Sequence, residues 1–263
     1  MSDLVSIIIA NYNYADFLAE TIRSAQAQTY PNIEILFIDD GSTDNSPDVA
    51  SQFDITILAQ ENQGVCAARN NALSFAKGKY VIFLDADDIL MPMAVEKLYN
   101  LMCGSKADIG YIYGQMEYFD QKTGLFPSRQ FCSKALAKGN YISVTCLFEK
   151  SKLIEKGGFD RGLVVREDWE LFIRLWHHGI KGRLLSEPIL KCRKHKDGQN
   201  RAISKSKHLV QVKLFYKYPK FFFRKFLTKP WRYIYYLTVC SIGQDLGLYG
   251  PTSTSIQVLK KKA

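Results

Sequence analysis

Short apolar runs alternate with amphipathic stretches through the first 90 residues. The apolar runs are residues 5–9, 33–38, 55–58 and 80–84, and residues 5–9 are typical of a strand buried on both faces. Between them, residues 14–28 and 64–76 place apolar side chains at helical spacing. Strands that alternate with helices predict a parallel sheet wound from βαβ units. The expected fold class is therefore α/β, with a mostly parallel central sheet flanked by helices.

The second half of the chain shows a looser pattern. Its expected helices are residues 93–102, 151–156 and 167–178, and its expected strands are residues 109–119, 141–148 and 188–192. Residues 121–140 begin with a turn signal and are expected to form a loop that helps to choose the substrate. Lys, Arg and aromatic residues become frequent after about residue 200. We therefore expect a domain over residues 1–200, with halves at about 1–92 and 93–200, and a mainly helical extension over residues 201–263.

Composition excludes several classes of protein. With 47% hydrophobic and 23% charged residues among 263, the chain is neither disordered nor collagen-like. Its six cysteines include no Cys-x-x-Cys pair, which argues against zinc or a disulfide framework and for reduced thiols in a cytosolic protein. The apolar run at residues 4–10 is short and follows no basic residue. It predicts neither a signal peptide nor a membrane span.

Charge is divided unevenly along the chain. Residues 191–263 contain 17 Lys and Arg against two acids, a net charge of +15. Residues 1–190 contain 18 Lys and Arg against 24 acids, a net charge of −6. An acidic body could hold a metal ion, and a basic tail is expected to seek an anionic partner.

The basic tail also contains clusters of aromatic residues between positions 205 and 236. Bases at positions 224, 225, 229 and 232 prevent a span of about 20 apolar residues. The tail could lie on an anionic membrane surface, with its aromatic rings at the headgroups. Alternatively, Phe221, Phe222, Phe223 and Tyr235 could pack on the main domain. Nucleic-acid binding ranks last among these hypotheses.

The strongest candidate for chemistry is the acid cluster Asp85-Ala86-Asp87-Asp88, directly after an apolar run. Alternate residues of an extended segment point the same way, so Asp85 and Asp87 can converge on one ligand. Hard divalent ions such as Mg²⁺ and Mn²⁺ bind carboxylate oxygens. Asp is also a favoured turn and helix N-cap residue, so a purely structural loop is the alternative.

Polar residues follow the other expected strands of the first half as well. They form the segments Ala10-Asn-Tyr-Asn13, Asp39-Asp-Gly-Ser-Thr-Asp44, Asn62-Gln-Gly64 and Ala68-Arg-Asn70. All would face the carboxyl edge of the sheet, where open α/β sheets bind ligands. A tyrosine can stack on a base, a carboxylate can accept from a ribose hydroxyl, and an arginine can pair with a phosphate. The pattern predicts a nucleoside diphosphate pocket, and the chain has neither a dinucleotide-binding nor a P-loop glycine motif.

Six motifs, in order, resemble the family 2 glycosyltransferases of the GT-A fold. They are Val5-Ser-Ile-Ile-Ile-Ala-Asn-Tyr-Asn13, Ile38-Asp-Asp-Gly-Ser-Thr-Asp44, Gly64 with Ala68-Arg-Asn70, Leu84-Asp-Ala-Asp-Asp88 with Pro92, Gly157-Gly-Phe-Asp160, and Glu167-Asp-Trp-Glu-Leu171. The match covers residues 4 to about 200. Ala10 departs from it, because the family usually has Pro there; we expect a looser turn but no lost ligand.

The resemblance implies roles for individual residues. Tyr12 and Asp40 would hold a uracil-type base with Asp39 beside them, Arg69 would lie near the diphosphate, Asp85 would contact the ribose, and Asp87 would ligate Mn²⁺ or Mg²⁺. The nucleotide-sugar motifs also include Ala10, Asn13, Gly64 and Ala86. His195 would help to bind the metal or the diphosphate, although a histidine in a basic loop can equally be a plain surface residue.

Asp168 resembles the catalytic base of this family, with Glu167 in reserve. An ordinary aspartate is ionised at neutral pH and can take the proton of an attacking hydroxyl. The structural alternative is that both are first-turn acids of a helix, which the helix macrodipole favours.

The resemblance implies a metal-dependent, inverting hexosyl- or N-acetylhexosaminyltransferase. Residues 1–92 would bind a nucleoside diphosphate sugar, with a UDP-sugar favoured, and residues 93–200 would bind the acceptor. The basic tail, if it docks on a membrane, would favour as acceptor a saccharide or lipid-linked saccharide of surface polysaccharide or glycolipid synthesis, met in the cytoplasm or on the cytoplasmic face of the membrane. Two alternatives stay open: a metal-dependent nucleotidyltransferase, and a non-catalytic basic binding protein that would need no acid cluster.

Overall fold

Strands and helices alternate along the chain in a computed structural model that describes residues 2–126, 128–163, 165–195, 210, 213–219, 221–222 and 257–258. The strands are β1 Val5–Asn11, β2 Ile33–Asp39, β3 Thr56–Ala59, β4 Tyr80–Asp85, β5 Ile89–Leu90, β6 Ile109–Asp120, β7 Gly124–Leu125, β8 Cys146–Glu149, β9 Lys181–Lys194 and β10 Gln257–Val258. The helices are α1 Ala15–Gln26, α2 Ser46–Ser51, α3 Val65–Phe75, α4 Ala94–Cys103, α5 Ser133–Leu136, α6 Lys150–Glu155 and α7 Glu167–His177.

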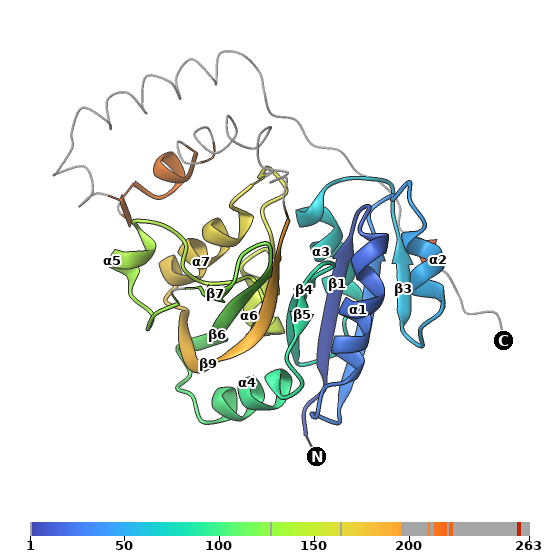
Figure 1. The fold of residues 1–263 in the computed structure, drawn as a ribbon. Coiled ribbons are helices and arrows are strands. Elements are labelled where there is room, and N and C mark those ends of the chain that lie inside the picture. The colour runs from blue at the N-terminus through green and yellow to red at the C-terminus, as the bar shows by residue number, and fades with distance from the viewer. Residues whose placement is uncertain are drawn as a thin grey trace, which may run out of the picture.

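The strands form a single mixed sheet (Figure 1). Its order is β10-β3-β2-β1-β4-β8-β6-β9-β5, with β7 paired to β6. Strands β3, β2, β1 and β4 are parallel, which confirms the expected βαβ winding of the first half. Strand β8 runs antiparallel to both β4 and β6, and so joins this half to the long parallel pair of β6 and β9.

Three elements of the second half differ from the sequence prediction. The expected strand 141–148 is reduced to β8, because Asn140 turns the chain by accepting from Ile142 N at 3.1 Å. Strand β9 begins at Lys181 rather than at Pro188, and the prediction missed its first half because Gly182 and Pro188 interrupt it and leave no apolar run to mark it. The expected loop 121–140 contains the short elements β7 and α5.

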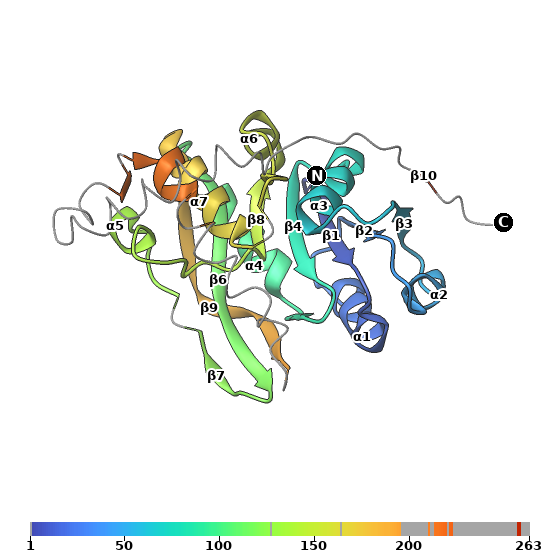
Figure 2. The ribbon, with the colours of Figure 1, turned by 90° about the horizontal axis from the view of Figure 1, so that it is seen from above.

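A hydrophobic layer covers each face of the sheet. Alternate residues of β1 divide between the layers, as a strand buried on both faces requires: Ile8 packs with α3 and α7, whereas Ile7 and Ile9 pack with α1 and α4. Figure 2 shows α1 and α3 on opposite sides of β1.

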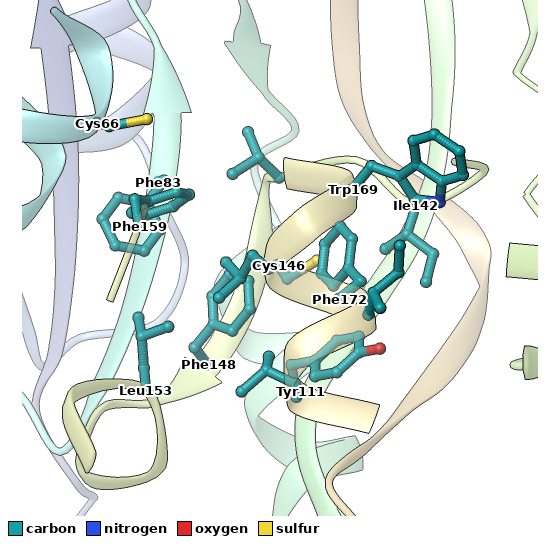
Figure 3. Packing of buried hydrophobic residues seen from close by; sticks show 14 of the residues in the cluster. Cys66, Phe83, Tyr111, Ile142, Cys146, Phe148, Leu153, Phe159, Trp169 and Phe172 are labelled. Carbon is teal, nitrogen blue, oxygen red and sulfur yellow. The ribbon is translucent and has the colours of Figure 1, made fainter. Parts of the chain in front are cut away.

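Aromatic rings fill the layer beneath α7 (Figure 3). Phe83 of β4 meets Phe159 with ring centroids 4.9 Å apart, and Phe148 of β8 stacks on Phe172 of α7 at 6.2 Å. Burial of each such side chain contributes about 1.5–3 kcal/mol. This packing fixes α7 relative to the strands that end at the polar edge of the sheet.

The described part of the C-terminal extension packs on α7. Phe222 is fully buried and meets Trp169 edge-on at 5.9 Å, and Phe221 contacts Trp176 at 4.8 Å. The packing hypothesis holds for these two residues, while Phe223, Tyr235 and most of the extension lie outside the described residues. Among the helices that the structure describes, none has the length and apolar character needed to cross a bilayer.

Candidate functional site

A cavity of about 310 Å³ lies at the carboxyl ends of β1, β2 and β4. The residues that line it are Ala10, Asn11, Tyr12, Tyr14, Asp40, Val65, Ala68, Asp85, Ala86 and Asp87. Six of the ten are candidates from the sequence: Ala10, Tyr12, Asp40, Asp85, Ala86 and Asp87. The others were not named as site residues, although Asn11 and Ala68 stand inside the motifs and could have been found there.

Two side chains of the cavity wall have groups free for a ligand. Tyr12 is 46% exposed, so a face of its ring is open to stacking. Asn11 is buried, and its Oδ1 atom accepts no hydrogen bond from the described residues. A buried acceptor without a donor costs about 1–3 kcal/mol, which an N–H group of a ligand would recover.

Asp40 is held in a fixed position at the cavity. Its Oδ1 accepts from Gln60 Nε2 at 2.6 Å and from Gln63 N at 2.9 Å, and its Oδ2 accepts from Gly64 N at 2.8 Å. Gly64 has φ of 85°, a left-handed conformation that favours glycine. The glycine therefore aims its N–H at Asp40 at the start of α3, rather than lining the cavity itself.

Asp39 and Asn13 shape the loop that follows β2. Asp39 Oδ2 accepts from Ser42 N at 2.9 Å, and Asn13 Oδ1 accepts from Thr43 N at 2.8 Å. Neither residue is among those that line the cavity. Their hydrogen bonds hold the loop against the end of β1.

Arg69 lies beneath the cavity and connects strand β4 to helix α7. Its side chain is 5% exposed, and its guanidinium pairs with Asp85 Oδ1 at 2.6 Å and with Glu167 Oε1 at 3.0 Å. The same group lies over the ring of Phe159 at 5.1 Å. Arg69 thereby ties the carboxyl end of β4 to the first residue of α7.

Asp87 and His195 meet although 108 residues separate them. Asp87 Oδ2 lies 2.8 Å from His195 Nε2, and the His195 ring packs on Phe17 at 5.1 Å. Burial raises the pKa of Asp87, and the hydrogen bond with His195 opposes that rise. No group of three or more His, Cys, Asp or Glu within the described residues could hold a metal ion. An ion at this place would have to share its coordination with a ligand and water.

Asp88, a member of the acid cluster to which the sequence assigned no role of its own, and Arg193, which no motif contains, hold the Asp87–His195 pair together. Asp88 Oδ1 accepts from Arg193 N at 2.9 Å, and Arg193 Nε donates to Asp87 O at 3.1 Å. Burial, followed by the charge of Asp85, raises the pKa of Asp88 well above its ordinary value. These contacts join the end of β9 to the acid cluster, and so place His195 beside Asp87.

Asp168, the second residue of α7, has a strongly raised pKa. Burial, and then the charge of Glu167, raises the pKa of Asp168 to about 7. Its Oδ2 accepts from Asn140 Nδ2 at 2.7 Å and its Oδ1 from Trp169 N at 2.6 Å. Such a carboxyl can exchange a proton at neutral pH. It does not line the cavity, but Arg69 and Glu167 link its helix to Asp85.

Comparisons with known proteins agree with this architecture. The glycosyl transferase family 2 model matches residues 6–160. The glycosyltransferase GlyG of Streptococcus pneumoniae serotype 4 is 37% identical over 147 residues, 52% of this chain and 48% of that protein. The UDP-Glc:alpha-D-GlcNAc-diphosphoundecaprenol beta-1,3-glucosyltransferase WfaP of Escherichia coli is 34% identical over 188 residues, 69% of this chain and 73% of that protein. The chain thus spans about half the length of the first relative and about three quarters of the second.

Two solved structures share the fold. TarS 1-349 of S. aureus in complex with UDP-GlcNAc superposes with a TM-score of 0.65 at 18% identity, over 81% of this chain and 66% of that one. The mannosyltransferase PcManGT of Pyrobaculum calidifontis, in complex with GDP-Man and Mn²⁺, gives 0.61 at 21% identity, over 84% and 65%. These likenesses confirm the expected GT-A fold. Together with the motifs, the match over residues 6–160 shows that the chain belongs to glycosyl transferase family 2.

Proposed function

We propose that this enzyme is an inverting glycosyltransferase that moves a sugar from a UDP-sugar to a hydroxyl of a saccharide or lipid-linked saccharide. The observation that carries the proposal is the cavity, where Tyr12, Asp40 and Asp85 converge beside the Asp87–His195 pair. Two comparisons support the donor and acceptor classes: the TarS structure holds UDP-GlcNAc, and the name of WfaP specifies UDP-Glc and a diphosphoundecaprenol-linked sugar.

The cavity wall offers what a nucleotide needs. Tyr12 stacks on the base, Asp40 accepts from a base N–H, and Asp85 accepts from a ribose hydroxyl. The unsatisfied Oδ1 of Asn11 can accept a further N–H. Arg69 orients the carboxylate of Asp85 toward the nucleotide, because its guanidinium pairs with both Asp85 and Glu167.

The Asp87–His195 pair fits a divalent ion. Asp87 Oδ2 and His195 Nε2 lie 2.8 Å apart, and both would hold such an ion together with the donor and water. A carboxylate with an imidazole suits Mn²⁺ better than Mg²⁺, which prefers oxygen ligands, and the PcManGT structure is a complex with GDP-Man and Mn²⁺. When bound, the ion offsets the charge that develops on the leaving diphosphate.

Asp168 is the base in this proposal. Ionised Asp168 takes the proton from the acceptor hydroxyl as that oxygen attacks the anomeric carbon from the face opposite the diphosphate. Hydrogen bonds from Asn140 Nδ2 and Trp169 N fix the orientation of the Asp168 carboxylate. A single displacement of this kind inverts the anomeric configuration.

The test is thermal stabilisation by UDP, GDP, dTDP, CDP and ADP, each with and without Mn²⁺. A ligand that binds the folded state raises its stability by mass action. We expect a Mn²⁺-dependent shift with UDP that Asp87→Ala abolishes. Asp48→Ala, which removes an exposed carboxylate from α2, is the matched control and retains the shift. No shift with any nucleotide would overturn the proposal, and pyrophosphate release from a nucleoside triphosphate would identify a nucleotidyltransferase instead.

A further inference from the structure

A cationic surface surrounds α5. The segment of residues 126–148 contains Arg129, Lys134 and Lys138 but no Asp or Glu. Arg166, the N-cap residue of α7, adds a fourth cation. Within the described residues none of these four forms an ion pair. By contrast, Arg69, Arg193 and Lys217 each pair with two acids, and Arg174 shares Glu170 with Lys217. We call Arg129, Lys134, Lys138 and Arg166 the α5 patch.

Aromatic rings hold the two arginines of the α5 patch in place. The Arg129 guanidinium lies over Tyr141 at 5.5 Å, and that of Arg166 lies over Trp169 at 5.3 Å. A guanidinium stacked on a ring keeps its N–H edge available for the oxygens of a phosphate. Both donor groups are therefore ordered before a ligand arrives.

Both rings are anchored to α5. Tyr141 Oη accepts from Cys132 N at 2.7 Å, just before the helix begins. Trp169 Nε1 donates to the carbonyl of Leu136, the last residue of the helix, at 2.8 Å. The two arginines therefore belong to the two ends of a single helical turn, about 6 Å long, with Lys134 on the turn and Lys138 just after it.

The α5 patch lies next to the proposed base. Tyr141 follows Asn140, which donates to Asp168, and Trp169 follows Asp168 itself. Figures 1 and 2 both show α5 beside α7. An anion held by the patch would thus be close to the hydroxyl whose proton Asp168 accepts.

We propose that the α5 patch binds the phosphate or diphosphate group of the acceptor, so that the enzyme selects a phosphate-linked sugar over a neutral one. The inference rests on the proposed function, because it takes Asp168 as the base. The diphosphate of the donor would take its counter-charge from a divalent ion held at the Asp87–His195 pair, and so would not need the α5 patch. Two linked phosphoryl groups present enough oxygens to engage two guanidinium groups at once.

Calorimetry with farnesyl diphosphate tests the inference. The full chain is first saturated with UDP and an equal amount of Mn²⁺, and is then titrated with farnesyl diphosphate or with neutral farnesol. We expect only the diphosphate to bind, with an affinity that falls as salt rises. Arg129→Gln/Arg166→Gln is expected to weaken it at least about tenfold, and Lys134→Gln/Lys138→Gln to weaken it less, since lysine lacks the planar fork.

Lys106→Gln is the matched control. Lys106 is also exposed and without an ion pair among the described residues, but it precedes β6 at the amino end of that strand. Its variant is expected to bind farnesyl diphosphate as the unaltered chain does. Because Lys134 and Lys138 are exposed on the surface, their double variant tests the patch even if the arginine variant folds poorly.

Other outcomes separate the two proposals. Equal farnesyl diphosphate binding by all variants, or a loss of that binding when the UDP concentration is raised further, would overturn the role of the α5 patch while leaving the donor site intact. If the arginine variant lost binding to phosphatidylglycerol vesicles but kept its affinity for farnesyl diphosphate, the patch would be a membrane surface instead. If the chain does not bind UDP in a Mn²⁺-dependent way when it is first loaded, the proposed function is overturned, and the acceptor role of the α5 patch is overturned with it.

Discussion

Asp168 is the residue on which the proposed chemistry depends, and its environment sets the pH at which it works. Burial and the charge of Glu167 raise the pKa of Asp168 to about 7. Only the ionised carboxylate can accept a proton, so kcat/KM is expected to fall as pH decreases below about 7 and to level off above it. Initial rates between pH 5.5 and 8.5 measure this profile.

The matched variants for this prediction are Asp168→Asn and Asp48→Asn. Loss of the base is expected to lower kcat by about 100-fold or more, whereas the exposed Asp48 carboxylate on α2 should be dispensable. UDP affinity, measured over the same pH range, controls for changes in donor binding. A flat rate profile, or an Asp168→Asn enzyme that keeps its rate, would remove Asp168 from the mechanism.

The same carboxyl should reduce the stability of the fold at high pH. A folded-state pKa above the unfolded value means that the folded chain binds more protons, so the free energy of unfolding decreases as pH rises from about 4 through about 7. Asp168→Asn carries no charge to bury. We expect it to be more stable than the unaltered enzyme at pH 8 and nearly equal to it at pH 4.5, as measured by urea unfolding. Equal stability at both pH values would contradict this expectation.

At the scale of elements, a buried acid joins α7 to the C-terminal segment of residues 213–219. Glu170 is fully buried; its Oε1 accepts from Lys217 Nζ at 2.7 Å and from Tyr218 Oη at 2.6 Å, and its Oε2 pairs with Arg174 at 3.0 Å. A charge at this depth is tolerated only because it is paired and hydrogen-bonded. The segment therefore acts as a brace on the helix that carries Asp168.

Tyr218→Phe tests this brace. The variant removes one donor from a buried carboxylate and is expected to lower the free energy of unfolding by about 1–3 kcal/mol. Tyr216→Phe on the same segment is the matched control, because Tyr216 is 60% exposed and such surface changes usually stay within about 0.5 kcal/mol. Denaturant unfolding of both variants measures the difference. Equal effects would show that the hydroxyl of Tyr218 does not stabilise the contact.

The elements that the sequence predicted well are those in which one pattern dominates. Continuous apolar runs identified β1, β2 and β4, because each is buried on both faces. The first half of β9 was missed because Gly182 and Pro188 interrupt it and it shows no regular alternation, and α5 is too short to show a period. The extent of β9 and the position of α5 depend on tertiary contacts, which the periodicity of the sequence does not reveal.

The candidate site divides in the same way. The carboxyl ends of parallel strands share an edge, so the convergence of Tyr12, Asp40 and Asp87 followed from topology. The distant partner His195 was suggested by family resemblance, and Asn140 has no local signal because it acts only through its contact with Asp168. Glu170 fits the pattern of a first-turn acid, so its burial beneath Tyr218 could not be predicted from sequence.

At the scale of the whole molecule, the basic extension opposes an acidic body. The net charge is −6 over residues 1–190 and +15 over residues 191–263. Phe221 and Phe222 pack on α7, so these rings are not available to a membrane. The bases of the extension should attract an anionic bilayer, and this electrostatic attraction should weaken strongly as salt is added.

The final prediction compares two pairs of charges of equal size. Arg224→Gln/Lys225→Gln removes two bases from the extension, and Lys77→Gln/Lys106→Gln removes two exposed bases from the body. Each base near an anionic surface contributes about 1 kcal/mol, roughly fivefold in affinity. Binding to phosphatidylglycerol vesicles at low salt, measured by sedimentation, should therefore weaken far more in the first double variant than in the second. Neutral phosphatidylcholine vesicles should bind neither variant. Equal losses for both pairs would mean that net charge alone, rather than the extension, draws the enzyme to the membrane.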